Sequence, residues 1–192
     1  MSLLFFDTEF TGLHKDTTLI SLGIVSDNGK KFYAEFTDYD ENQCDEWIKY
    51  NVVKNLCLGG MGDGVADLGE EPSGIMVRGD KKYIGKELKE WLSQFDSIQF
   101  VSDVCHYDFV LLIDLLTGSK TALDLPDNIS AVCHDINSDI ARHYRISDKE
   151  AFDFSREEIM YDACMGYNYV EGIKHNALYD AEVIKTIYDA IK

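Results

Sequence analysis

Leu3-Leu4-Phe5-Phe6-Asp7-Thr8-Glu9 is the stretch of sequence that decides the fold. The four apolar residues at its start are typical of a central strand that is buried on both faces. Because strand side chains alternate between faces, Asp7 and Glu9 point to one side and Thr8 to the other. Carboxylates about 7 Å apart at the end of a buried strand are costly unless a cation lies between them. Mg²⁺ and Mn²⁺ prefer such oxygen ligands, although Asp7 could also simply end the strand and cap the next segment of chain.

Further strands and helices continue the pattern along the chain. Apolar runs predict strands over residues 19–25 and 31–36, joined by a hairpin turn at 27–29, and over residues 98–102 and 129–132. Helical spacing of apolar residues predicts helices over 41–56, 81–95, 106–116 and 177–191, with further helical segments between 136 and 169. Trp47, Tyr50 and Val53 are expected to form the apolar face of the first helix. Strands and helices that alternate in this way indicate an α/β or α+β domain.

Two of these helices each carry an acid on the apolar face. Asp180 lies one turn before three isoleucines of the last helix, at positions 184, 187 and 191. Asp108 shares a face with three leucines of the helix at 106–116. An acid on a buried stripe usually has a metal or a cationic partner. Together with Asp7 and Glu9, these residues would bring four negative charges inward, which is the charge that two divalent cations neutralise.

His175 lies five residues before Asp180, at the start of the last helix. The ordinary pKa of a histidine is near physiological pH, so an imidazole beside a metal site can act as a general base. A histidine taken alone is more often an ordinary surface residue. Its position beside the four acids favours the catalytic interpretation.

The charge composition limits the kinds of nucleic-acid partner that the chain can bind. The chain has 192 residues with 35 acids, 18 lysines and arginines, and a formal net charge of −17. Proteins that bind a long duplex do so through many lysine and arginine contacts with phosphates, so this charge balance weighs against such binding. A nucleic-acid contact must be short or mediated by metal ions.

The N-terminus has no basic region of the kind that begins a signal peptide, and no stretch is long and apolar enough to span a membrane. The five cysteines form no Cys-x-x-Cys pair, which is typical of reduced thiols. We therefore expect a cytoplasmic protein without membrane contact. Glycines are dense over residues 59–74, and because they match no phosphate-binding motif, we expect a flexible insertion there.

The sequence resembles the DEDDh 3′–5′ exonucleases in three motifs and in their order along the chain. The motifs are residues 6–13 (Phe-Asp-Thr-Glu-Phe-Thr-Gly-Leu), Tyr107-Asp108, and His175 with Asp180. The sequence is most similar to the small ribonuclease T-like exoribonucleases of actinobacteria and phages. The resemblance covers about residues 3–189. It implies a ribonuclease H-like α/β fold with a mixed five-stranded sheet flanked by helices, a single domain over residues 1–192, and a homodimer.

The resemblance also implies roles for individual residues. Asp7 would bridge two divalent cations, Mg²⁺ or Mn²⁺, with Glu9 and Asp180 on the first and Asp108 on the second. Asp103 is a competing third acid, but Asp108 is favoured because only it lies on the apolar stripe. The residues expected to contact nucleic acid are Phe10, Thr11 and Leu13. For Phe10 and Leu13, packing within the loop is the alternative.

The predicted function is hydrolysis of single-stranded RNA, or of short 3′ overhangs, from the 3′ end to nucleoside 5′-monophosphates. In this mechanism His175 takes a proton from a metal-activated water that attacks the terminal phosphodiester. DNA is the alternative substrate for the same site. A catalytically silent acidic interaction protein is an alternative of another class, favoured by the net charge, although such a protein would keep its acids outward.

Overall fold

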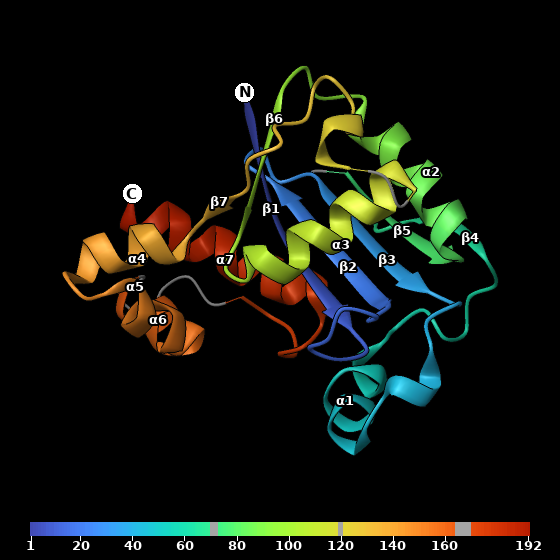
Figure 1. Cartoon of the computed structure of the whole chain (residues 1–192), viewed down its shortest axis with the longest axis horizontal. Helices are drawn as coiled ribbons and strands as arrows, with labels where there is room; N and C mark the ends of the chain where they lie inside the picture. Colours follow the sequence, from blue (N-terminus) through green and yellow to red (C-terminus); the bar gives the residue numbers. More distant parts are fainter. Residues whose placement is uncertain (70–72, 119–120, 164–169) are drawn as a thin grey trace.

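The computed structural model describes residues 1–69, 73–118, 121–163 and 170–192. Within these residues one mixed sheet has seven strands in the order β4-β5-β3-β2-β1-β6-β7 (Figure 1). Their bounds are β1 (Ser2–Phe10), β2 (Leu19–Ser26), β3 (Lys31–Phe36), β4 (Gly64–Asp67), β5 (Gly74–Gly79), β6 (Ile98–Ser102) and β7 (His134–Asp135). The α/β class is therefore confirmed, but the expected number of five strands is wrong.

The central part of the sheet agrees with the sequence prediction. β1 pairs antiparallel with β2 and parallel with β6, and β2 pairs antiparallel with β3. The turn between β2 and β3 is tight, and Gly29 takes the positive φ of 85° that such a turn requires. The strand expected at 129–132 is absent from the described structure, where Ile129 makes only an isolated bridge to Ile98 and β7 comes next at 134–135.

The glycine-rich segment contains part of the sheet. β4 pairs antiparallel with β5, and β5 pairs in parallel with β3. The expectation of a continuous loop over 59–74 is therefore wrong for β4. A four-residue edge strand of glycine, small and acidic residues has too little apolar alternation to be recognised from sequence. Residues 70–72 lie outside the described residues, and the flexibility of the segment stays a prediction.

Helices lie between the strands at the predicted places, with shorter bounds in two regions. Residues 137–163 form three short helices, because Arg145 ends the first with a left-handed φ of 57° and Ser147 starts the second with a capping box. The rest of this predicted helical region, 164–169, lies outside the described residues. The α-helices are α1 (Glu46–Asn51), α2 (Lys81–Leu92), α3 (Cys105–Thr117), α4 (Asn137–Tyr144), α5 (Asp148–Asp153), α6 (Arg156–Ala163) and α7 (Ala177–Ile191). Three 3₁₀ turns lie at Glu41–Gln43, Val53–Asn55 and Ala122–Asp124.

The sheet separates two hydrophobic cores, and alternate residues of β1 contribute to each. Leu4 and Phe6 pack in a core with residues of α2 and α3. Phe5 packs on the other face with residues of α4, α6 and α7. Figure 1 shows α3 and α7 on opposite sides of β1. The acids that continue β1 at positions 7 and 9 therefore share the face of α7, and Thr8 shares the face of α3.

Helix α7 begins in direct contact with the sheet. A Cβ atom at Gly23 of β2 would lie 2.3 Å from the backbone of Ala177. Gly23 is also the partner of Asp7 in the β1–β2 pair. The absence of a side chain at Gly23 therefore lets the start of α7 lie close beside Asp7. No helix among the described residues has the length and apolar character needed to span a membrane.

Candidate active site

The predicted acids and histidine meet at one end of the sheet. Asp7 and Glu9 come from the end of β1, Asp108 from the first turn of α3, and His175 and Asp180 from the start of α7. All five line one cleft of about 680 Å³. The structure therefore brings together every residue predicted to be catalytic, from segments up to 173 positions apart in the sequence.

Within the cleft these residues form two groups, and the grouping differs from the one that the resemblance implies. One carboxylate oxygen from each of Asp7, Asp103 and Asp108 lies within 4.8 Å of the others. The same criterion joins Glu9, His175 and Asp180. Asp103, which the sequence analysis treated as a rival of Asp108, lies in the same group as Asp108.

Asp108 is fixed by hydroxyl groups from two strands. Its side chain is 1% exposed, and its carboxylate accepts hydrogen bonds from Thr8 Oγ1 at 2.7 Å and Ser102 Oγ at 2.6 Å. Thr8 is on the α3 face of β1, which is why it meets an acid from α3. Sequence reasoning did not single out Thr8 or Ser102, although a hydroxyl residue at the end of each apolar strand could have indicated them.

Burial and mutual repulsion raise the pKa values of three acids of the cluster, Asp7, Asp108 and Asp180. Burial, followed by the charges of Asp108 and Asp180, raises the pKa of Asp7 well above its ordinary value. Burial raises the pKa of Asp108 to about 8, although its two hydroxyl partners oppose the shift. Burial and the charge of Glu9 raise the pKa of Asp180 to about 7.

One atom of the cluster lacks a partner. Asp7 Oδ2 is buried and has no hydrogen-bond partner among the described residues. A buried carboxylate oxygen without a donor costs free energy that a cation would recover. The orphaned oxygen, the raised pKa values and the all-oxygen donor set therefore fit a hard divalent cation.

His175 is held beside Glu9 and Asp180. Its backbone takes a left-handed φ of 64°, which is uncommon outside glycine. Its Nδ1 lies 3.5 Å from Glu9 Oε1, and its backbone N–H donates to Asp180 Oδ2 at 2.8 Å. The hydrogen bond with Glu9 raises the pKa of His175 above its ordinary value, while burial opposes the shift.

The neighbouring Asn176 anchors this segment to the rest of the domain. It caps α7, and its Nδ2 donates to the Tyr33 hydroxyl at 3.2 Å and to the Asn55 carbonyl at 3.3 Å. Asn55 in turn donates to the Lys174 carbonyl at 3.0 Å. Asn55 thus holds the Lys174 carbonyl before His175, and Tyr33 and Asn55 hold the Asn176 side chain after it.

The three residues expected to contact nucleic acid differ in their surroundings. The Phe10 ring stacks on Tyr107 with centroids 5.4 Å apart, and Leu13 is 74% exposed at the cleft. Thr11 is fully buried, and its hydroxyl bonds to Gln43 and to the backbone of Thr18. A direct contact of the Thr11 side chain with a substrate has no support in this arrangement, because its hydroxyl holds the loop together.

Trp47 is a cleft residue that the sequence analysis misplaced. The helical spacing put it on the apolar face of its helix, but Ile48 and Val52 are the buried residues there and Trp47 is 54% exposed. Its ring lies 5.0 Å from that of His175, edge to face. The helix α1 is only 6 residues long, so its apolar face could not be fixed by periodicity.

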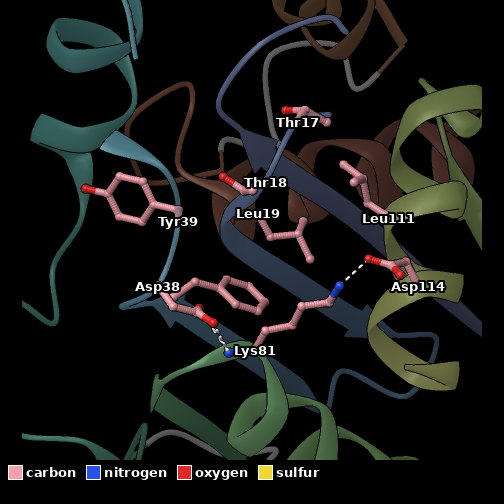
Figure 2. Close-up of a pocket in the computed structure, with 9 residues that line it drawn as sticks. Thr17, Thr18, Leu19, Asp38, Tyr39, Lys81, Leu111 and Asp114 are labelled. Carbon is pink, nitrogen blue, oxygen red and sulfur yellow. Dashed lines mark hydrogen bonds and ion pairs between the residues drawn. The ribbon is translucent and has the colours of Figure 1, made fainter. Parts of the chain in front are cut away.

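A second, smaller hollow lies apart from the acid cluster (Figure 2). It has a volume of about 70 Å³, and Thr17, Thr18 and Asp38 are among the residues that line it. An ion pair between Lys81 and Asp114 joins α2 to α3 at this hollow. The Lys81 backbone N–H also donates to Asp38 Oδ1 at 3.0 Å. These contacts connect the loop after β3 to α2 and α3, and we assign the hollow a structural role.

Comparison with known proteins supports the relationship that the motifs indicate. No family model matches the chain. The 3′-5′ exoribonucleases Rv2179c and MT2234.1, from two strains of Mycobacterium tuberculosis, are each 30% identical to it over 121 residues. The match covers 62% of this chain and 63% of each relative, so the chain spans somewhat less than two thirds of the curated relatives that it matches.

A solved structure shares the fold over nearly the whole chain. S. pombe Pop2p, in a form with Mg²⁺ and Mn²⁺ bound, superposes with a TM-score of 0.60 and 15% identity. The superposition covers 97% of this chain and 81% of Pop2p. The ribonuclease H-like fold is therefore confirmed, and the two curated relatives, which are 3′-5′ exoribonucleases, agree with the resemblance that the motifs indicate.

Proposed function

We propose that the protein is a metal-dependent 3′–5′ exoribonuclease that shortens single-stranded RNA, or short 3′ overhangs, to nucleoside 5′-monophosphates. The observation that carries this proposal is the convergence of Asp7, Glu9, Asp108, His175 and Asp180 in one cleft. The names of the two mycobacterial relatives support RNA as the substrate. The alternative of a silent acidic protein loses support, because the acids in question are turned inward rather than presented to a partner.

The chain offers carboxylates for two divalent cations, Mg²⁺ or Mn²⁺. Asp7 is the residue proposed to hold both, with Glu9 and Asp180 on one side and Asp108 on the other. The unpartnered Asp7 Oδ2 and the raised pKa values of Asp7, Asp108 and Asp180 support this assignment. Cations bound there would lower the pKa of a water and neutralise the charge that develops on the phosphate.

His175 is proposed to be the general base. Glu9 lies against its Nδ1 and orients the ring. With Nδ1 held in this way, the opposite nitrogen is available to accept the proton of an attacking water. The hydrogen bonds of Lys174 and Asn176, on both sides of His175, favour one position of the ring beside Glu9.

Apolar side chains at the cleft are proposed to hold the last bases of the strand. Leu13 and Trp47 are exposed there, and Phe10 is backed by Tyr107. Stacking on aromatic rings tolerates any base and does not need a basic surface. This mode of binding suits a chain with a net charge of −17, because affinity would come from the bases and the metal ions rather than from phosphate contacts.

A time course on end-labelled strands tests the proposal. Single-stranded RNA and DNA of the same sequence, and a blunt RNA duplex, are incubated with Mg²⁺, Mn²⁺ or EDTA, beside the Asp7→Asn variant. We expect stepwise loss of nucleotides from the 3′ end of RNA, no cleavage with EDTA or with the variant, and resistance of the blunt duplex. Internal cleavage would indicate an endonuclease, preference for DNA would reassign the substrate, and absence of any cleavage would favour the silent protein.

Three further expectations stay predictions: a single exonuclease domain over residues 1–192, a cytoplasmic location and a homodimer. Light scattering on the purified chain measures the mass in solution directly. A mass of 21.8 kDa would identify a monomer. Twice that value would support the dimer.

A further inference from the structure

The acid cluster in the cleft has a further member, Asp103, with a partner of its own. Asp103 lies just after β6, and one of its oxygens lies within 4.8 Å of ligand oxygens from Asp7 and Asp108. Its Oδ2 accepts a hydrogen bond from Arg156 Nε at 2.7 Å. The carboxylate of Asp108 has hydroxyl partners instead, which are neutral. Asp103 is thus the member of its group that is paired with a permanent positive charge.

Arg156 is held in one orientation by several acceptors. Its Nη2 donates to Asn137 Oδ1 at 2.6 Å, and its Nη1 donates to the carbonyls of Ala151 and Phe154 at 3.0 and 3.2 Å. The side chain is 16% exposed. A guanidinium fixed by acceptors on α4, on α5 and on the loop after β6 cannot turn away from Asp103 without breaking several hydrogen bonds.

A fixed cation beside a cluster of carboxylates changes what the cluster can bind. Among the described residues that line the cleft, the other lysine or arginine is Lys174. It pairs with Glu157 and is 53% exposed, so solvent screens its charge more. Arg156 is close to Asp103 and largely buried, where charges interact more strongly. It repels a divalent cation in the cleft, while Asp103 attracts one.

We propose that Asp103 and Arg156 form a built-in charge pair in which Arg156 offsets the contribution of Asp103 to the affinity of the acid cluster for divalent cations. Asp103 strengthens cation binding, Arg156 weakens it, and the two effects nearly cancel in the intact pair. Arg156 is a positioning residue that acts through Asp103, and it does not touch the substrate. This inference rests on the proposed function, because the cations are those that the exonuclease site is proposed to hold.

Calorimetric titration of Mn²⁺ into EDTA-stripped protein at pH 8 tests the pair without any activity measurement. Arg156→Met should bind Mn²⁺ at least about 10-fold more tightly than the wild type, because a repelling charge is lost. Asp103→Asn should bind at least about 10-fold more weakly, because Arg156 is left without its partner. The double variant should return to within about threefold of the wild type, because the two opposing charges leave together.

Arg156→Lys is the matched control. It keeps the positive charge but loses the planar fork that holds four acceptors. We expect its Mn²⁺ affinity to stay within about twofold of the wild type, while its melting temperature falls. If Arg156→Met fails to fold, as judged by circular dichroism, Arg156→Gln, which keeps hydrogen-bond donors without the positive charge, is titrated in its place and should also bind Mn²⁺ more tightly than the wild type.

The possible results separate this inference from the proposed function. If the wild type binds no Mn²⁺, both are overturned. If Asp7→Asn abolishes binding but neither Asp103→Asn nor Arg156→Met changes the affinity, the exonuclease site stands and the charge pair is wrong. Weaker binding by Arg156→Met would also overturn the pair, because it would indicate that Arg156 only holds the cleft in shape.

Discussion

Without divalent cations, the free energy of unfolding should increase as the pH falls from 8 to 6, which is the reverse of the usual effect of acid on a folded protein. Asp108 has a folded-state pKa of about 8, whereas an ordinary aspartate in the unfolded chain has a pKa of about 3.9. The folded state therefore binds this proton more tightly, so the free energy of unfolding rises as the pH falls below 8 and is lost again as the pH rises through 8. Asp180, at about 7, acts in the same direction.

The size of the effect is set by linkage. Between pH 8 and pH 6, Asp108 alone should add about 2 kcal/mol to the free energy of unfolding of the metal-free protein. For a chain of this length, that corresponds to a rise in melting temperature of about 4–8 °C. With saturating Mn²⁺ the free energy of unfolding should instead decrease as the pH falls, because cation binding requires deprotonated carboxylates and is lost in acid.

Thermal melts monitored by circular dichroism, in EDTA and in millimolar Mn²⁺ across pH 6–8, measure both curves. His175 also has a raised pKa, so its protonation stabilises the fold in the same direction. Asp108→Asn therefore serves as the control, and it should reduce the slope of the metal-free curve while the contributions of Asp180 and His175 remain. A metal-free melting temperature that stays constant or falls between pH 8 and pH 6 would refute the reasoning.

Three substitutions test other parts of the site. His175→Ala should lower turnover roughly 10²–10⁴-fold, as for a lost general base, and Mn²⁺ should still raise its melting temperature because His175 is not proposed as a ligand. Gly23→Ala should cost roughly 1–3 kcal/mol of stability and lower activity by displacing α7. The control Gly59→Ala, with open space around its Cβ, should leave both unchanged in the same denaturation and turnover assays. Trp47→Ala should raise KM for single-stranded RNA several-fold, whereas Tyr50→Ala, on the same helix but outside the cleft lining, should not; equal KM values would remove Trp47 from the substrate site.

The residues that sequence reasoning placed well are those with a strong local pattern. Asp108 and Asp180 could be assigned to the inward faces of α3 and α7, because each helix is long and has several apolar residues in register. The alternation of β1 fixed which side Thr8 faces. These assignments depend only on the geometry of one element.

The features that it missed depend on pairing between distant elements. The four residues of β4 form a strand because they pair with β5. The position of Trp47 at the cleft could not be predicted, because α1 is too short for its spacing to define an apolar face. The contact between Asp103 and Arg156 joins residues 53 positions apart. Nothing in the local sequence of either residue specifies the other.

The alternation of β1 side chains between the two faces of the sheet has a consequence for how the protein can be assayed. A slip of one residue in the pairing of β1 would turn Asp7 and Glu9 into the core beneath α2 and α3, and would turn Phe6 and Thr8 to the face of α7. Moving two carboxylates into an apolar core costs several kcal/mol each, which is comparable with the whole stability of an ordinary domain. Molecules that are compact but wrongly paired should therefore not accumulate. The specific activity of the proposed exonuclease would then measure the folded fraction of a preparation, and on storage or heating the two should decline in proportion.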